Sequence, residues 1–210
     1  MNSRTAIDVS HLPQDTLDHR SSIWWGNLLL LIIETTMFGI LVATYLYVRV
    51  IDFKQWPPPL VDVHPPIYHP LPELKVANIN LALLLFSVIP MALVDRACLK
   101  RRQGIVRIGL ILCILLGLGC IALRCLEFKA LHFRWDSNAY GSVTWTILGM
   151  HLLHLLTGTC ENGLMAAWIF RHGMDDKHAR DVRVGAIYWY WIAGTWVLLY
   201  GLIFWGPRLF

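Results

Sequence analysis

Five long apolar runs dominate the pattern of hydrophobic and polar positions along this chain. They lie near residues 23–48, 76–95, 106–126, 142–170 and 186–206. A helix of about 20 apolar residues crosses the hydrocarbon core of a bilayer, and each run is long enough to do so. The pattern therefore predicts an all-α integral membrane bundle of five transmembrane helices.

Composition agrees with this class and leaves little room for a second domain. Of the 210 residues, 56% are hydrophobic and 15% are charged, which is unlike a water-soluble globule. We expect a cytoplasmic N-terminal segment, residues 1–22, followed by a transmembrane domain, residues 23–210. The polar N-terminal segment contains no apolar region ahead of a small-residue cleavage site, so no cleavable signal is expected. The five cysteines form no CxxC or disulfide pattern and are interpreted as small core residues.

The distribution of basic residues predicts the orientation of the chain. Eleven Lys and Arg residues lie before the first run, between the second and third runs, and between the fourth and fifth runs. Seven lie on the opposite side. The positive-inside bias then places the N-terminus in the cytoplasm and the C-terminus outside. Lipid headgroups account for these basic clusters, so nucleic acid is not expected as a partner.

One carboxylate, Glu34, interrupts the first apolar run about half-way along it. An ionisable group at that depth is costly, so it usually faces a bundle interior and has a functional role. We expect Glu34 to be partly buried against other helices of the same chain.

The fourth run concentrates polar groups on one helix face. At 100° per residue, His151, His154 and Glu161 fall within an arc of roughly 100°. Three interpretations remain open for this face. Its groups could ligate iron or copper, could hydrogen-bond across helices and fix their packing, or could share a proton-linked or lipid-linked role with Glu34.

The spacing of the polar residues argues against a metal site in this chain. Di-metal carboxylate bundles use Glu-x-x-His pairs on two helices, and this sequence contains no such pair. Haem needs axial ligands placed across a cavity, which two histidines on one helix face do not supply. We therefore expect no metal ligand, no redox centre and no catalytic residue here.

Other polar residues near the ends of the runs have simpler interpretations. Arg124 and Glu127, three residues apart, are expected to form a local ion pair near the outer surface. Asn80, at the outer end of the second run, is expected to cap a helix or to hydrogen-bond across helices. Trp168 and Arg171, at the cytoplasmic end of the fourth run, are candidate partners for lipid headgroups.

Several segments taken in order resemble subunit III of the haem–copper respiratory oxidases, the cytochrome c oxidase subunit III family. The resemblance covers residues 23–206 with all five runs collinear, in the form of a short five-span bacterial member. The segments are ETTMFGILVATYLYVR, WPPP followed by HPLPELKVANIN, LRCLEF, YGSVTWTILGMHLLHLLTGT and YWYWIAGTWVLLYGLIFWG.

The last run departs from the pattern of this family, which reads Tyr-Trp-His-Phe-x-Asp-x-x-Trp. Tyr190 stands at the histidine position and Ala193 at the aspartate position. Glu161 is a further charge that the family pattern does not lead us to expect. These departures keep open two alternatives, a quinol-oxidase counterpart and a subunit-III-like accessory protein of a nitric oxide reductase.

The resemblance implies a non-catalytic subunit of a proton-translocating cytochrome c oxidase in a bacterial inner membrane. Haem and copper would lie in the partner subunits I and II. This chain would stabilise the catalytic subunit, bind phospholipid and support proton uptake. Glu34 matches the reactive buried carboxylate of the family.

Overall fold

The computed structural model of the chain describes residues 21–51, 56–60, 66–68 and 70–209. Most of the expected N-terminal segment, residues 1–20, lies outside these described residues. The described parts are helical apart from connecting loops and one isolated bridge between Leu60 and Ile67, which confirms the all-α class. The helices are α1 (Ser22–Ile51), α2 (Leu74–Leu99), α3 (Gln103–Ala130), α4 (Ala139–His172), α5 (Asp176–Tyr200), a π-helical turn (Gly201–Trp205) and α6 (Gly206–Leu209).

Four helical segments are long and apolar enough to cross a membrane. They are α1, α2, α3 and the continuous segment Asp176–Leu209. Large apolar side chains are exposed along them, such as Ile33 on α1 and Ile108 on α3. An exposed apolar surface of this extent is typical of contact with lipid or with other subunits.

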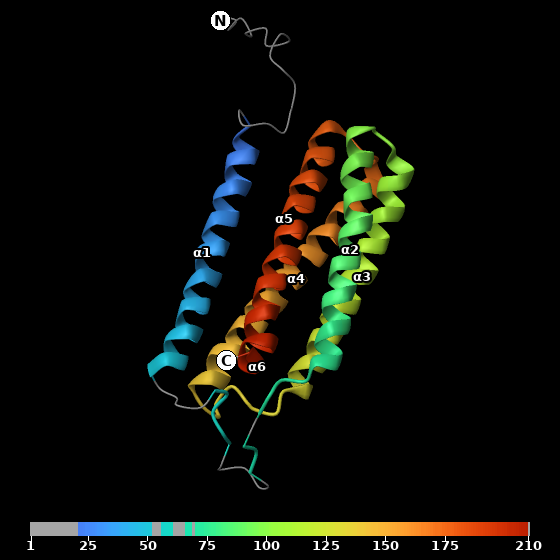
Figure 1. Cartoon of the computed structure of the whole chain (residues 1–210). Coiled ribbons are helices and arrows are strands. Elements are labelled where there is room, and N and C mark those ends of the chain that lie inside the picture. Colours follow the sequence, from blue (N-terminus) through green and yellow to red (C-terminus); the bar gives the residue numbers. More distant parts are fainter. Residues whose placement is uncertain (1–20, 52–55, 61–65, 69, 210) are drawn as a thin grey trace, which may run out of the picture.

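Helix α4 has 34 residues, as many as the longest of these segments, but histidines, Glu161 and Asn162 interrupt its apolar sequence. It takes a central position in the bundle. Helices α4 and α5 pack on each other, with α1 on one side and the antiparallel pair α2–α3 on the other (Figure 1). A central helix can carry polar groups because neighbouring helices cover and pair them.

Glycines allow the close packing of α4 on α5 and α3. A Cβ atom at Gly158 would lie 3.1 Å from atoms of Trp189 and Ile192 on α5. A Cβ atom at Gly117 on α3 would lie 2.5 Å from the hydroxyl of Thr159. Trp189 itself is fully buried, and its indole N–H donates to Ser87 Oγ on α2 over 2.9 Å. Small residues thus let large aromatic side chains fill the centre of the bundle.

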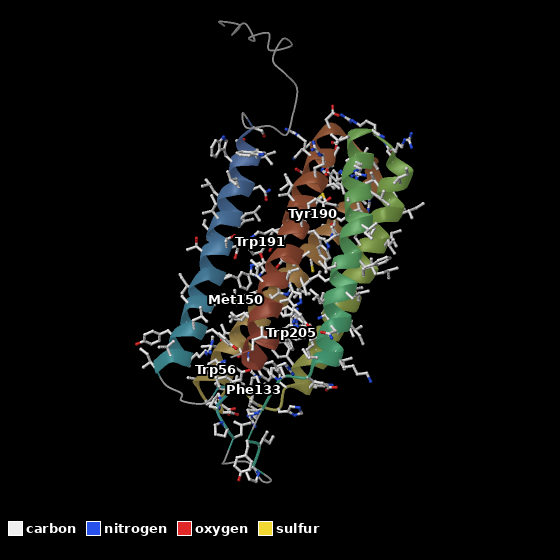
Figure 2. The ribbon with its side chains drawn as sticks, viewed as in Figure 1. Trp56, Phe133, Met150, Tyr190, Trp191 and Trp205 are labelled. Atoms are coloured by element: carbon white, nitrogen blue, oxygen red, sulfur yellow. The ribbon has the colours of Figure 1, made fainter. Side chains whose placement is uncertain are left out.

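An aromatic cluster joins the end of α1 to the start of α4. The ring of Trp56 lies 5.1 Å from that of Tyr45 and 4.7 Å from that of Tyr140, and Phe133 packs on Tyr140 at 4.9 Å. Figure 2 shows Trp56 and Phe133 at the end of the bundle opposite the start of α1. The cluster holds α1 at this end.

The fifth helix begins at Asp176, well before the apolar run that starts near 186. The side chain of Asp175 caps it by accepting a hydrogen bond from the backbone N–H of His178 over 3.0 Å. This hydrogen bond, together with one from the His178 side chain, lowers the pKa of Asp175 below its ordinary value of 3.8. The apolar run marks only the part of the helix that suits a membrane, whereas the cap sets where the helix begins.

Candidate functional site

Glu34 on α1 is joined to His154 on α4. Glu34 Oε2 lies 2.9 Å from His154 Nε2, and the two side chains are 22% and 7% exposed. This confirms the expectation that Glu34 is partly buried against another helix of the same chain. It also brings together two of the residues selected from the sequence, which are 120 positions apart.

The other ring nitrogen of His154 fixes the chemistry of this contact. His154 Nδ1 lies 2.6 Å from the carbonyl oxygen of Met150, which can only accept, so Nδ1 carries a hydrogen and donates it. A neutral His154 therefore presents a lone pair at Nε2, and Glu34 must then donate a carboxyl proton to it. Alternatively, Nε2 carries the proton and donates it to an ionised Glu34. In both states the pair holds one proton between Oε2 and Nε2.

Aromatic side chains pack against one side of the pair. The rings of Phe38 and Trp191 lie 5.2 Å and 5.3 Å from the ring of His154. The indole N–H of Trp191 donates to Thr35 Oγ1 on α1 over 2.9 Å, which ties α5 to α1 beside Glu34. Figure 2 places Trp191 on the side of α5 that faces α1. In such surroundings a hydrogen bond between ionisable groups is stronger than in water.

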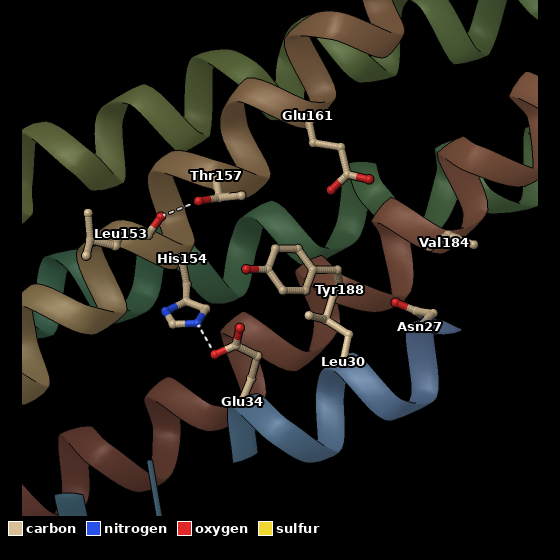
Figure 3. A pocket seen from close by; sticks show the side chains of 9 residues that line it. All are labelled: Asn27, Leu30, Glu34, Leu153, His154, Thr157, Glu161, Val184 and Tyr188. Carbon is tan, nitrogen blue, oxygen red and sulfur yellow. Dashed lines mark hydrogen bonds and ion pairs between the residues drawn. The ribbon is translucent and has the colours of Figure 1, made fainter. Parts of the chain in front are cut away.

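The pair opens into a cavity of about 270 Å³ between α1, α4 and α5 (Figure 3). The cavity extends from the pair towards the end of the bundle where α4 passes into α5. Glu161, the third residue selected from the sequence, also lines it. The lining consists of Asn27, Leu30, Glu34, Leu153, His154, Thr157, Glu161, Val184 and Tyr188.

The single polar face expected on α4 is divided between two sets of neighbours. His154 and Glu161 face the cavity beside α1 and α5, whereas His151 turns towards α3 and α5. His151 Nε2 donates to the carbonyl oxygen of Ile192 over 3.2 Å, and its Nδ1 accepts from Arg124 over 3.2 Å. His151 is therefore a neutral histidine with both nitrogens hydrogen-bonded.

Arg124 and Glu127 form the expected ion pair, which is buried in the bundle near the C-terminal end of α3. Their side chains are 0% and 2% exposed, and Arg124 Nη1 donates to Glu127 Oε2. Asn80 on α2 donates to Glu127 Oε1 over 2.8 Å, as the expected hydrogen bond across helices. The guanidinium of Arg124 also lies 3.5 Å from the centre of the Trp196 ring. The cluster joins four helices and is neutral overall, which allows two charges to be buried.

The candidate lipid-headgroup residues lie at the turn between α4 and α5. The ring of Trp168 stacks on His172 at 4.3 Å and on His178 at 4.5 Å. Arg171 is exposed in the last turn of α4. An exposed indole beside several basic groups is a typical arrangement for the membrane interface.

A second cavity, of about 520 Å³, was not evident from the sequence. It lies between α1 and α5 on the other side of Trp191, and its lining is largely apolar. Apolar residues on two distant helices give no signal in the sequence that they face one another. The lining consists of Thr35, Phe38, Gly39, Val42, Trp191, Thr195, Leu198, Leu199 and Leu202.

Comparison with known proteins identifies the family of this chain. Residues 6–207 match the family model of cytochrome c oxidase subunit III. Cytochrome c oxidase subunit 3 of Lumbricus terrestris is 27% identical over 150 residues, which are 71% of this chain and 55% of that protein. The Polypterus ornatipinnis protein is 29% identical over 151 residues, again 71% of this chain and 55% of the relative. The chain thus spans about half the length of the curated relatives it matches.

Proposed function

This chain belongs to the cytochrome c oxidase subunit III family, and we propose that it is a non-catalytic subunit of a haem–copper terminal oxidase. In this role it stabilises the catalytic subunit, binds phospholipid and supports proton uptake. The observation that carries the proton-linked part is the hydrogen bond between Glu34 Oε2 and His154 Nε2 beside a cavity.

The pair suits a supporting role in proton uptake. It can gain a second proton, which leaves both a neutral carboxyl group and an imidazolium, or release its one proton and become an anion. The adjoining cavity gives water molecules a path to the pair. The pair can therefore hold a proton near the partner subunit without performing the redox chemistry.

We propose that α4 is the fifth transmembrane span, with the N-terminus in the cytoplasm of a bacterium and the C-terminus outside. Its two buried histidines have partners, since His151 contacts Arg124 and His154 contacts Glu34. At 34 residues it is about 50 Å long, more than the thickness of a hydrocarbon core. The basic residues of the α2–α3 and α4–α5 turns support this orientation in the inner membrane.

The second cavity supports the lipid-binding part of the proposal. Its volume and apolar lining suit the acyl chain of a phospholipid lying between α1 and α5. Trp168 and Arg171 remain the candidates for contact with headgroups at the cytoplasmic end.

Haem and copper are assigned to the partner subunits I and II rather than to this chain. Among the described residues, no three His, Cys, Asp or Glu side chains come together as metal ligands would. His151 is the most buried histidine, and its two nitrogens are already occupied by Arg124 and Ile192.

Purification of the tagged chain in a mild detergent from membranes that express it tests the proposal. We expect a haem-bearing complex that reduces oxygen, together with bound phospholipid. Glu34→Gln is expected to leave the haem spectrum intact and to reduce steady-state proton uptake. Recovery of a haem-free single chain from fully active membranes would refute the proposal.

The residues of α5 that depart from the family pattern favour a second candidate, an accessory subunit of a quinol oxidase or of a nitric oxide reductase. Ala193, at the position of the family aspartate, is 2% exposed. Tyr190, at the position of the family histidine, packs against the central core. Assays of the same purified complex with cytochrome c, a quinol, oxygen and nitric oxide separate these candidates. Reduction of nitric oxide but not oxygen would favour the reductase.

A further inference from the structure

We propose that Glu161 is a second proton-binding carboxylate of the cavity and passes protons between the α4–α5 turn and the Glu34–His154 pair. The inference rests on the proton-linked role proposed for that pair. It adds the side of the cavity from which protons enter, and it adds Glu161 as a second carboxylate that binds them.

The arrangement of the helices places Glu161 between the pair and the turn. Along α4, Glu161 lies seven residues beyond His154 towards the end of the helix, a rise of about 10 Å. Along α1, Asn27 lies seven residues before Glu34 in the same direction, and both residues line the cavity. The cavity thus runs along the helix axes, with Glu161 on the side of the turn (Figure 3).

The carboxylate of Glu161 is available to bind a proton. Among the described residues it has no hydrogen-bond or ion-pair partner, and the one basic side chain lining the cavity is His154. The backbone of α5 leaves space for it at Gly185, where a Cβ atom would lie 3.1 Å from Glu161 Oε1. A carboxylate in an intramembrane cavity without a partner cation is stabilised by taking up a proton.

The neighbouring groups make proton binding at Glu161 and at the pair depend on each other. Among the described residues, the other charged or titratable groups lining the cavity are Glu34 on α1, His154 on α4 and Tyr188 on α5, and Asp181 on α5 acts on Glu161 electrostatically. A negative charge on Glu161 therefore favours retention of the proton that the pair holds. Loss of this charge makes the proton easier to release.

Each transfer conserves protons and charge. A cavity of about 270 Å³ has room for several water molecules, each of which occupies about 30 Å³ in the liquid. A hydronium ion at the side of the turn gives a proton to the Glu161 carboxylate, which leaves a water molecule and a neutral carboxyl group. This group passes a proton through water to the pair, which then holds two protons, and Glu161 returns to its anionic form.

Labelling of Glu34 in the intact membrane complex tests this coupling. A hydrophobic carbodiimide reacts with protonated carboxyl groups, and mass spectrometry measures the labelled fraction of Glu34 at each pH. We expect Glu161→Gln to move the midpoint of labelling to lower pH by roughly one unit, which is about a tenfold loss of labelling on the alkaline side. Glu161→Asp, which keeps the charge, is expected to restore the original midpoint.

Matched variants control for effects on folding. Glu73→Gln removes an exposed carboxylate outside the cavity and is expected to leave the midpoint unchanged. Gly185→Ala is expected to displace the Glu161 carboxylate and shift the midpoint, whereas Gly194→Ala on the same helix has open space and is expected to have no effect.

Superimposed labelling curves for the original chain and Glu161→Gln would overturn the inference. The outcome is distinct from failure of the proposed function. A chain that copurifies with no oxidase fails the proposed function even if Glu161 controls the labelling of Glu34. A chain that copurifies with an oxidase but gives superimposed curves retains that function and loses only the role of Glu161.

Discussion

Replacing Arg124 by leucine removes the positive charge from the buried cluster that joins α2, α3, α4 and α5. Glu127, with a side chain that is 2% exposed, then keeps a single hydrogen bond from Asn80. His151 loses its donor at Nδ1, and Trp196 loses the cation 3.5 Å from its ring centre. Breaking a buried ion pair on one side costs about 3–5 kcal/mol, since the remaining charge is left uncompensated. We expect a loss of this size for Arg124→Leu.

The double variant separates the cost of an orphaned charge from the value of the pair. Arg124→Met combined with Glu127→Leu removes both buried charges at similar volume and leaves Asn80 and His151 as neutral polar groups, and such replacements of a buried pair are often neutral or stabilising. We therefore expect the double variant to be more stable than either single variant. The interaction free energy between the two positions, obtained by comparing the double variant with the sum of the two single variants, is then at least about 2 kcal/mol.

Equilibrium unfolding of the purified chain in mixed detergent micelles, followed by circular dichroism, measures these free energies. An exposed pair serves as the control. Arg101 and Asp176 form an ion pair with side chains that are 55% and 50% exposed, and breaking it is expected to cost less than about 1 kcal/mol. If Arg124→Leu costs no more than this control, or if the double variant loses the sum of the two single losses, the reasoning on the buried cluster is refuted.

Three further predictions concern packing, capping and lipid. Gly117→Val is expected to lower the free energy of unfolding by about 1–3 kcal/mol, because the valine side chain has no space there. Gly149→Val, on α4, is the control because the space around Gly149 is open. Equal losses of stability in the two variants would contradict this prediction. Asp175 has a pKa lowered below 3.8 by hydrogen bonds from His178, so it stabilises the fold above about pH 5 and loses this contribution as the pH falls through the lowered pKa. Unfolding measured against pH is expected to lose this acid dependence in Asp175→Asn, and an unchanged profile would count against the cap. Gly39→Phe is expected to fill the second cavity and reduce the phospholipid that copurifies with the chain, measured by mass spectrometry; an unchanged lipid content would place the lipid elsewhere.

The class of the fold and the residues of the site are evident in the sequence. Apolar runs of about 20 residues indicate helices because a continuous apolar segment in a bilayer satisfies its backbone hydrogen bonds within itself. Glu34 is conspicuous because a charge inside such a run is costly, and His154 and Glu161 share a helix face because of the helical period. The structure then places all three around one cavity.

The sequence did not indicate that the Arg124–Glu127 ion pair is buried among other helices. Arg124 and Glu127 are three residues apart near the end of an apolar run, a spacing that fits a pair at the surface as well as a buried one. The choice depends on Asn80, His151 and Trp196, which belong to three other helices. Spacing within one helix carries no information about which side chains of other helices complete a cluster.

By itself, the sequence determined where helices form and which side chains are too polar for lipid, because both follow from local periodicity and the cost of burying charge. The tertiary structure decided which helices face one another. In the structure, His154 of α4 pairs with Glu34 on α1, whereas His151 of the same helix pairs with Arg124 on α3. Glu161 faces the cavity. These pairings join residues far apart along the chain, and only the packing of the whole bundle brings them within hydrogen-bond distance.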